Sequence, residues 1–139
     1  MREILFIAKR KDNGEWVEGY YLNVAKINHF ICTGKIKLDG VVKGIIAPEM
    51  YAIDPDTLCQ YTGLKDKNGR KIWENDIVQA WSEGSNAIGK VIRRVDGLYI
   101  MYPAYQKKEF WGLYPNKNGK TTVEVIGNIF DNADLLEVE

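Results

Sequence analysis

The residues best suited to catalysis are His29 and Cys32, which lie three positions apart. A histidine next to a cysteine can accept the thiol proton and so create a nucleophile. His29 is the only histidine in the chain, so any Ser-His-Asp or Cys-His arrangement must use it, and residues 25–34 around it read as a short helical turn or a loop. A lone histidine is far more often structural than catalytic. We therefore expect no enzymatic activity.

A second pattern that could hold an ion is Asp66–Gly69 followed by Glu74. The glycine comes two residues too early for the turn that wraps calcium in an EF-hand, so a β-turn is the better interpretation. The two cysteines, Cys32 and Cys59, are spaced neither as a CxxC redox motif nor as a zinc knuckle. The sequence thus predicts no metal or cofactor and two reduced thiols, which is typical of a cytoplasmic protein.

Basic and aromatic residues alternate in the second half of the chain, a combination that can grip single-stranded nucleic acid through phosphates and base stacking. The opposing interpretation is that lysines decorate exposed turns while alternate aromatics fill a small core. Four carboxylates lie among the basic residues, so we expect ion pairs to neutralise part of the surface. These are Asp66, Glu74, Asp76 and Asp96. The candidate binding surface comprises Lys65, Lys67, Arg70, Lys71, Trp73, Trp81, Arg93, Arg94, Tyr99 and Trp111.

Residues 107–112 mix charges and aromatics in the same way and predict either a partner-binding loop or a loop folded over one end of the fold by Phe110 and Trp111.

The elements that must position these residues belong to one soluble domain or two small lobes. The chain has 139 residues, 45% of them apolar and 27% charged, and its net charge is zero, so it has no long-range field to attract nucleic acid or an anionic membrane. No apolar run approaches the ~20 residues that a membrane span needs. The first apolar stretch runs directly into Lys9–Asp12 and is not a signal peptide. We expect a cytoplasmic location.

Turn dipeptides divide the chain into short apolar runs, which is the pattern of a mainly β protein. They are Asn13-Gly14, Asp39-Gly40, Asn68-Gly69, Asp96-Gly97 and Asn118-Gly119. Hairpins are predicted over 2–24, 36–46 and 89–102, a brief strand over 50–53, an exposed loop over 82–87, a last strand over 122–130 and a helical turn over 131–136. The Asp54-Pro55 turn marks the boundary between an N-terminal β lobe, residues 1–56, and a C-terminal lobe, residues 57–139. No internal repeat is apparent.

The stretch from Gln60 to Val78, QYTGLKDKNGRKIWENDIV, closely resembles the YopX family, small proteins found mainly in phages and prophages. Further similarity lies in 2–8, 16–20 and 125–132, so the resemblance spans essentially the whole chain. It departs from the family pattern at Ile7 and Lys9, and at Asn75, where a glycine is usual and where Asn also accepts left-handed geometry.

The resemblance implies a β-rich fold whose C-terminal lobe looks like an SH3-type barrel, and it brings no established activity, cofactor or catalytic residue. The order of turns and strands from Glu74 to Val91 is itself common in five-stranded small barrels. Such barrels have filled interiors, so binding takes place on their turns and rims.

Our leading hypothesis is a non-enzymatic module that binds a host or phage protein. The alternative is a nucleic-acid-binding barrel, and self-association through sheet edges is a further expectation.

Overall fold

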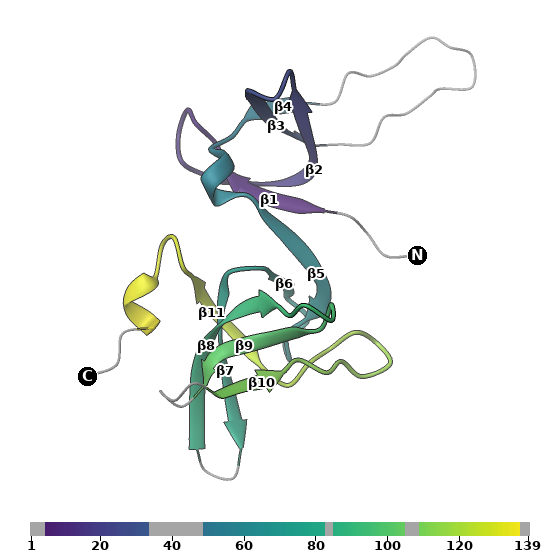
Figure 1. Cartoon of the computed structure of the whole chain (residues 1–139), viewed down its shortest axis with the longest axis vertical. Coiled ribbons are helices and arrows are strands. Elements are labelled where there is room, and N and C mark those ends of the chain that lie inside the picture. Colours follow the sequence, from purple (N-terminus) through teal and green to yellow (C-terminus); the bar gives the residue numbers. More distant parts are fainter. Residues whose placement is uncertain (1–4, 34–48, 83–84, 105–108, 137–139) are drawn as a thin grey trace. The chain divides into compact units, whose positions relative to one another are not determined.

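The described residues form antiparallel β-sheets and contain no α-helix, which confirms the mainly β prediction (Figure 1). The structure is a computed structural model that describes residues 5–33, 49–82, 85–104 and 109–136. The first five strands are β1 Phe6–Lys9, β2 Trp16–Val24, β3 Asn28–Thr33, β4 Glu49–Ala52 and β5 Cys59–Lys65. The others are β6 Lys71–Trp73, β7 Asp76–Ser82, β8 Ser85–Arg93, β9 Tyr99–Ala104, β10 Glu109–Gly112 and β11 Glu124–Asn128.

Two compact units divide the chain within β5, one over Glu3–Gln60 and the other from Tyr61 to the C-terminus. The sequence placed this division after Asp56, in the turn that precedes β5. That turn is a short 3-10 helix, Pro55–Thr57, in which the Asp56 backbone N–H donates to the Asp54 carboxylate at 3.0 Å. Because the two units are joined within a strand, β5 contributes its beginning to one and its end to the other.

In the N-terminal unit the strands pair in the order β4-β3-β2-β1, and β1 also pairs with the start of β5. Its core is a small cluster around Ala8, Ile31 and Ile53, each 0% exposed. The predicted first hairpin is confirmed as β1 and β2, and the predicted strand over 50–53 corresponds to β4. The predicted hairpin over 36–46 lies outside the described residues.

The helical turn or loop expected over residues 25–34 is wrong for Asn28–Thr33, which form β3. Residues 25–27 do make a turn, in which Ala25 and Lys26 have positive φ, 58° and 63°. Two successive left-handed residues make the tight turn that suits a β-hairpin, usually with Asn or Gly. Neither residue type stands here, so no turn dipeptide marks the start of β3.

In the C-terminal unit β7, β8, β9 and β10 form a meander, and β11 returns to pair with β7, giving the order β10-β9-β8-β7-β11. Among the described residues β10 and β11 are the free edges, so the expected closed barrel is not shown. The exposed loop predicted over 82–87 is also wrong, since β7 and β8 extend to Ser82 and Ser85 and Ala87 is 2% exposed. The predicted hairpin around Asp96-Gly97, the last strand and the C-terminal turn, a 3-10 helix over Ala133–Leu136, are confirmed.

Gly19 in β2 lies directly against the backbone of β3. A Cβ atom on Gly19 would lie 2.2 Å from the carbonyl oxygen of Cys32, which is backbone and cannot move aside. At Gly112 in β10 the added Cβ would lie 2.4 Å from the ring of Tyr114, an exposed side chain that can rotate away.

We predict that Gly19→Ala lowers the free energy of unfolding by more than about 3 kcal/mol, because the strands must separate to admit the methyl group. Gly112→Ala, the matched control, should cost less than about 1 kcal/mol. Urea denaturation of both variants measures the difference, and equal losses would contradict the close approach of β2 and β3.

Candidate binding surface

Asp66 organises the C-terminal unit although its side chain is only 1% exposed. Its Oδ1 accepts hydrogen bonds from the backbone N–H groups of Asn68 and Arg70, both at 2.9 Å, and its Oδ2 accepts one from Val125 N–H at 3.1 Å. The carboxylate therefore closes the turn after β5 and ties it to β11. Charge-assisted bonds of this kind are among the stronger hydrogen bonds in proteins. The rejection of a calcium loop is consistent with this arrangement, because the carboxylate is committed to the backbone.

A second turn, Asn116–Lys120, repeats the hydrogen bonds of the first turn, Asp66–Arg70. The Asn116 Oδ1 accepts from the backbone N–H of Asn118 and Lys120, as Asp66 Oδ1 does in its own turn. The remaining bonds correspond as well. In each turn the first residue donates its N–H to the carbonyl of the fifth at 2.8 Å, and the glycine donates to the carbonyl of the first at 3.0 Å. The glycine φ angles are 86° at Gly69 and 80° at Gly119.

The two turns lie side by side. Lys65, which precedes the first turn, forms a parallel bridge with Lys120. Its N–H donates to the Gly119 carbonyl at 2.8 Å, and its own carbonyl accepts from the N–H and the hydroxyl of Thr121 at 2.7 and 2.9 Å. A Cβ on Gly69 would lie 3.9 Å from Lys120 Cε, so the second turn's last side chain reaches the first turn.

We name this region the twin-turn surface. Its members are Lys65, Lys67, Arg70, Lys120 and Trp81. All five side chains are exposed. The Lys67 ammonium lies 4.1 Å from the centroid of the Trp81 ring, a cation–π contact that connects the first turn to β7. Trp81 keeps 44% of its surface exposed.

The ion pairs expected to neutralise this surface are not made by Asp66 or Asp76, since both carboxylates are buried. Glu74 accepts a hydrogen bond from the Tyr99 hydroxyl at 3.1 Å. Asp96 pairs with Arg94 at 3.4 Å on a different hairpin, so this expected ion pair is confirmed. The expectation is wrong for Asp66 and Asp76, because these buried carboxylates accept backbone N–H groups.

Other predicted site residues lie elsewhere. Trp73 and Tyr99 are 7% and 6% exposed, so these side chains are interior and not part of a rim. The Trp73 ring contacts the Tyr61 ring, with centroids 5.3 Å apart, and the Lys71 ammonium lies 5.8 Å from Tyr61. Trp111 in β10 is half-buried against the core. The described part of segment 107–112 is therefore not a loop but the edge strand β10, which pairs with β9.

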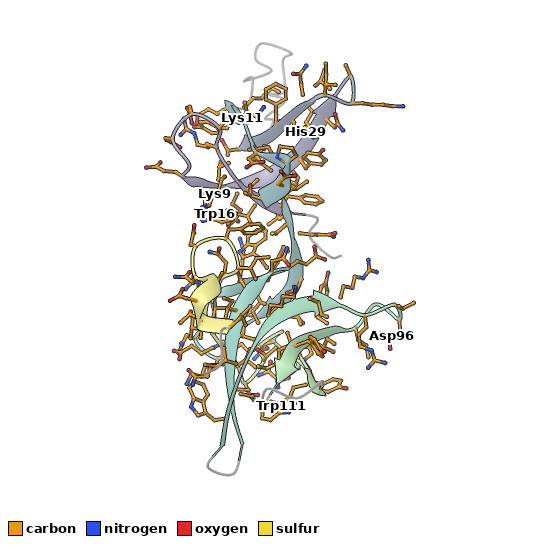
Figure 2. All side chains as sticks on the ribbon, turned by 60° about the vertical axis from the view of Figure 1, so that its left-hand side comes forward. Lys9, Lys11, Trp16, His29, Asp96 and Trp111 are labelled. Atoms are coloured by element: carbon orange, nitrogen blue, oxygen red, sulfur yellow. The ribbon has the colours of Figure 1, made fainter. Side chains whose placement is uncertain are left out.

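Arg93 and Arg94 belong to the β8–β9 hairpin, with Asp96 at its tip (Figure 2). Trp81 pairs with Asn86, and Arg93 lies seven residues further along β8, roughly 23 Å from Trp81 at strand spacing. These arginines therefore lie on a different hairpin from the twin turns and far from Trp81. Lys120 was missed, although the pattern Asx-Lys-Asn-Gly followed by a cation occurs twice in the sequence and could have revealed it.

The catalytic pairing of His29 with Cys32 is not made. Residues 29 and 32 of β3 project to opposite faces because strand side chains alternate. His29 Nδ1 lies 2.6 Å from the hydroxyl of Tyr21, and the two rings are stacked. Neither cysteine forms a disulfide bond; Cys59 is buried and Cys32 is half-buried. Among the described residues no group of three His, Cys, Asp or Glu side chains could hold a metal ion.

These features define a class: an antiparallel β protein with two units, whose candidate site is a pair of matched basic turns. The YopX protein family model matches residues 5–137, so the chain belongs to the YopX family. No curated protein matches it. Within the described residues, no helix is long and apolar enough to cross a bilayer.

Asp76 is a second buried carboxylate beside this site, at the start of β7. It follows Asn75, whose φ of 70° confirms the left-handed turn expected there. Its Oδ2 accepts the backbone N–H of Trp73 at 2.9 Å. Burial raises the pKa of Asp76 to about 7; the Trp73 hydrogen bond and the charge of Arg70 lower it, and the charge of Asp66 raises it.

We predict that Asp66→Asn lowers the free energy of unfolding by about 2–4 kcal/mol. An amide has one oxygen, so either the turn N–H groups or the Val125 N–H must face an NH₂ group. Asp96→Asn is the control, because Asp96 Oδ1 accepts the Leu98 N–H at the exposed surface of its turn, and this substitution should cost less than about 1 kcal/mol. Chemical denaturation at pH 7 compares them, and indistinguishable losses would contradict the role of Asp66.

We predict that Asp76 makes the protein less stable as pH rises from about 4 to about 7. A carboxyl with a raised folded-state pKa favours folding when protonated, and this contribution is lost as pH passes from the unfolded pKa to the folded one. Asp76→Asn keeps an oxygen for the Trp73 N–H but does not titrate. The stability of this variant relative to the natural protein should increase by about 3–4 kcal/mol between pH 4 and pH 8. Parallel stability curves would refute the prediction.

Proposed function

We propose that this chain is a non-enzymatic binding module encoded by a phage or prophage, which acts in the bacterial cytoplasm. Its C-terminal unit engages an acidic patch on a host or phage protein through the twin-turn surface. One observation carries the proposal: two turns with the same hydrogen-bond pattern lie side by side and expose their cations. The Asp66 carboxylate, by contrast, is buried.

Rigid presentation supports a binding role. Each turn is closed by side-chain and backbone hydrogen bonds, and the turns are bonded to one another through Lys65. Cations held on a rigid frame lose less conformational freedom on binding than cations on a mobile loop. The exposed Trp81 adds an aromatic anchor of the kind enriched in protein interfaces.

The small-barrel interpretation belongs to the same proposal. The strand order β10-β9-β8-β7-β11 places the last strand beside the first strand of the meander, as in an SH3-like barrel that has been opened. Side chains such as Val91 and Met101, each 0% exposed, fill its interior. Because the interior is filled, we expect a partner to bind at the turns.

A nucleic acid is the second candidate partner, and the Lys67–Trp81 contact is the observation that favours it. An exposed indole beside ammonium groups can stack on a base while the cations bind phosphates. The zero net charge of the chain supports the protein partner first, because it provides no long-range attraction for a polyanion.

The decisive experiment is affinity capture with the tagged full chain from nuclease-treated host lysate, followed by direct binding of the recovered protein. We predict that the double variant Lys67→Glu with Lys120→Glu weakens binding at least tenfold, because both turns then repel an acidic patch. Arg93→Glu, the control with a charge reversal on another hairpin, should bind like the natural protein. Failure to recover a direct binder, or equal binding by all three proteins, would contradict the proposal.

Salt titration of fluorescent single- and double-stranded oligonucleotides tests the second candidate. Nucleic-acid binding predicts an affinity that falls steeply with salt and is lost in the same double variant. Under the protein-partner proposal, oligonucleotides should not bind at about 150 mM salt.

A further inference from the structure

The two turns of the twin-turn surface carry an asparagine at the same position, Asn68 in the first turn and Asn118 in the second. Each is the third residue of its turn and precedes the glycine with positive φ. Both side chains are exposed. Because the backbone hydrogen bonds of the two turns correspond, both side chains leave the backbone at equivalent points. A difference in what they bind therefore comes from their surroundings.

In the first turn the asparagine amide already holds a carboxylate. The Asn68 Nδ2 donates a hydrogen bond to Glu124 Oε2 at 3.2 Å. Glu124 begins β11, and the next residue of that strand donates its N–H to Asp66, so the strand brings the carboxylate to the turn. A side-chain amide has two N–H donors, and an ionised carboxylate only accepts. The chain itself thus shows how such a turn binds a carboxylate.

In the second turn the same amide has no acceptor among the described residues. Asn118 donates its backbone N–H to Asn116 Oδ1, but its side chain makes no hydrogen bond within the part of the chain that the structure describes. The exposed cations of this turn, Lys117 and Lys120, form no ion pair with any described carboxylate. The second turn therefore offers an amide donor beside two cations.

The second turn is also the more positive of the two. It begins with the neutral Asn116, where the first turn has the carboxylate of Asp66. Residues 116–120 include two lysines and no acidic residue, whereas the cations of the first turn have Asp66 and Glu124 beside them. An incoming anion therefore meets less repulsion at the second turn.

We propose that the second turn is the primary site at which the twin-turn surface binds a carboxylate side chain, an Asp or Glu of the partner protein. This carboxylate accepts a hydrogen bond from the Asn118 amide, in the way that Glu124 accepts one from Asn68. Lys117 and Lys120 supply the attractive charge. The inference rests on the proposed function, because it specifies which group of an acidic partner is bound and where.

The first test is an NMR titration of the isotope-labelled full chain with a poly-glutamate peptide at about 50 mM salt, where surface charges are only partly screened. The side-chain NH₂ resonances of Asn118 should shift as the peptide binds. Those of Asn68 should stay in place, because Glu124 already occupies that amide. In the variant Glu124→Ala the Asn68 resonances should shift as well.

The outcomes of the titration separate this inference from the proposed function. Peptide binding that leaves the Asn118 resonances unchanged would overturn the inference and leave the proposed function standing. Absence of binding would contradict an acidic partner, and with it both proposals. A single-stranded oligonucleotide of equal charge that shifts Asn118 more than the peptide does would assign the turn to phosphates, and would also overturn the inference.

Affinity measurements on matched variants form the second test. Asn118→Ala should weaken binding of the same peptide about fivefold, as expected for the loss of one charge-assisted hydrogen bond at a surface. Asn68→Ala removes the same side chain from the same turn position and should change the affinity less than about twofold. Equal losses in the two variants would show that the asparagines act only through their turns, and would overturn the inference.

Discussion

The C-terminal unit depends on one carboxylate. Asp66 is buried, and its carboxylate accepts hydrogen bonds from three backbone N–H groups, two within its own turn and one on β11. A buried charge without such partners would strongly destabilise the fold, so the turn and β11 must be in place together. The same commitment removes a negative charge from the surface. Architecture and surface charge therefore have a common origin.

The turns that contain a glycine dipeptide could be predicted from the sequence. Such dipeptides indicate a residue with positive φ, and Gly69, Gly97 and Gly119 all adopt one. Sequence patterns failed at β3, where Ala25 and Lys26 make a left-handed turn without a glycine. They also failed to tell inward from outward aromatics: Trp73 and Trp81 lie eight residues apart in similar surroundings, and only packing decides that one is buried and the other is not. Burial is a property of the assembled sheet, which local residue spacing cannot reveal.

The two units have different surfaces. The N-terminal unit exposes the apolar side chains of Tyr20, Leu22, Val24 and Met50, and the C-terminal unit has matched basic turns beside an exposed indole. In our proposal the second of these surfaces binds the acidic partner. The YopX family model matches residues of both units, and the match itself assigns no activity to either.

The Asp66 carboxylate couples the turn after β5 to β11. Native-state hydrogen exchange of the Asn68, Arg70 and Val125 amides, followed by NMR, measures this coupling. We expect all three amides to exchange slowly and to become accessible in the same opening event, with a common dependence on denaturant. Rapid exchange at Asn68 and Arg70 while Val125 stays protected would show that the turn opens independently of β11, and that Asp66 does not couple them.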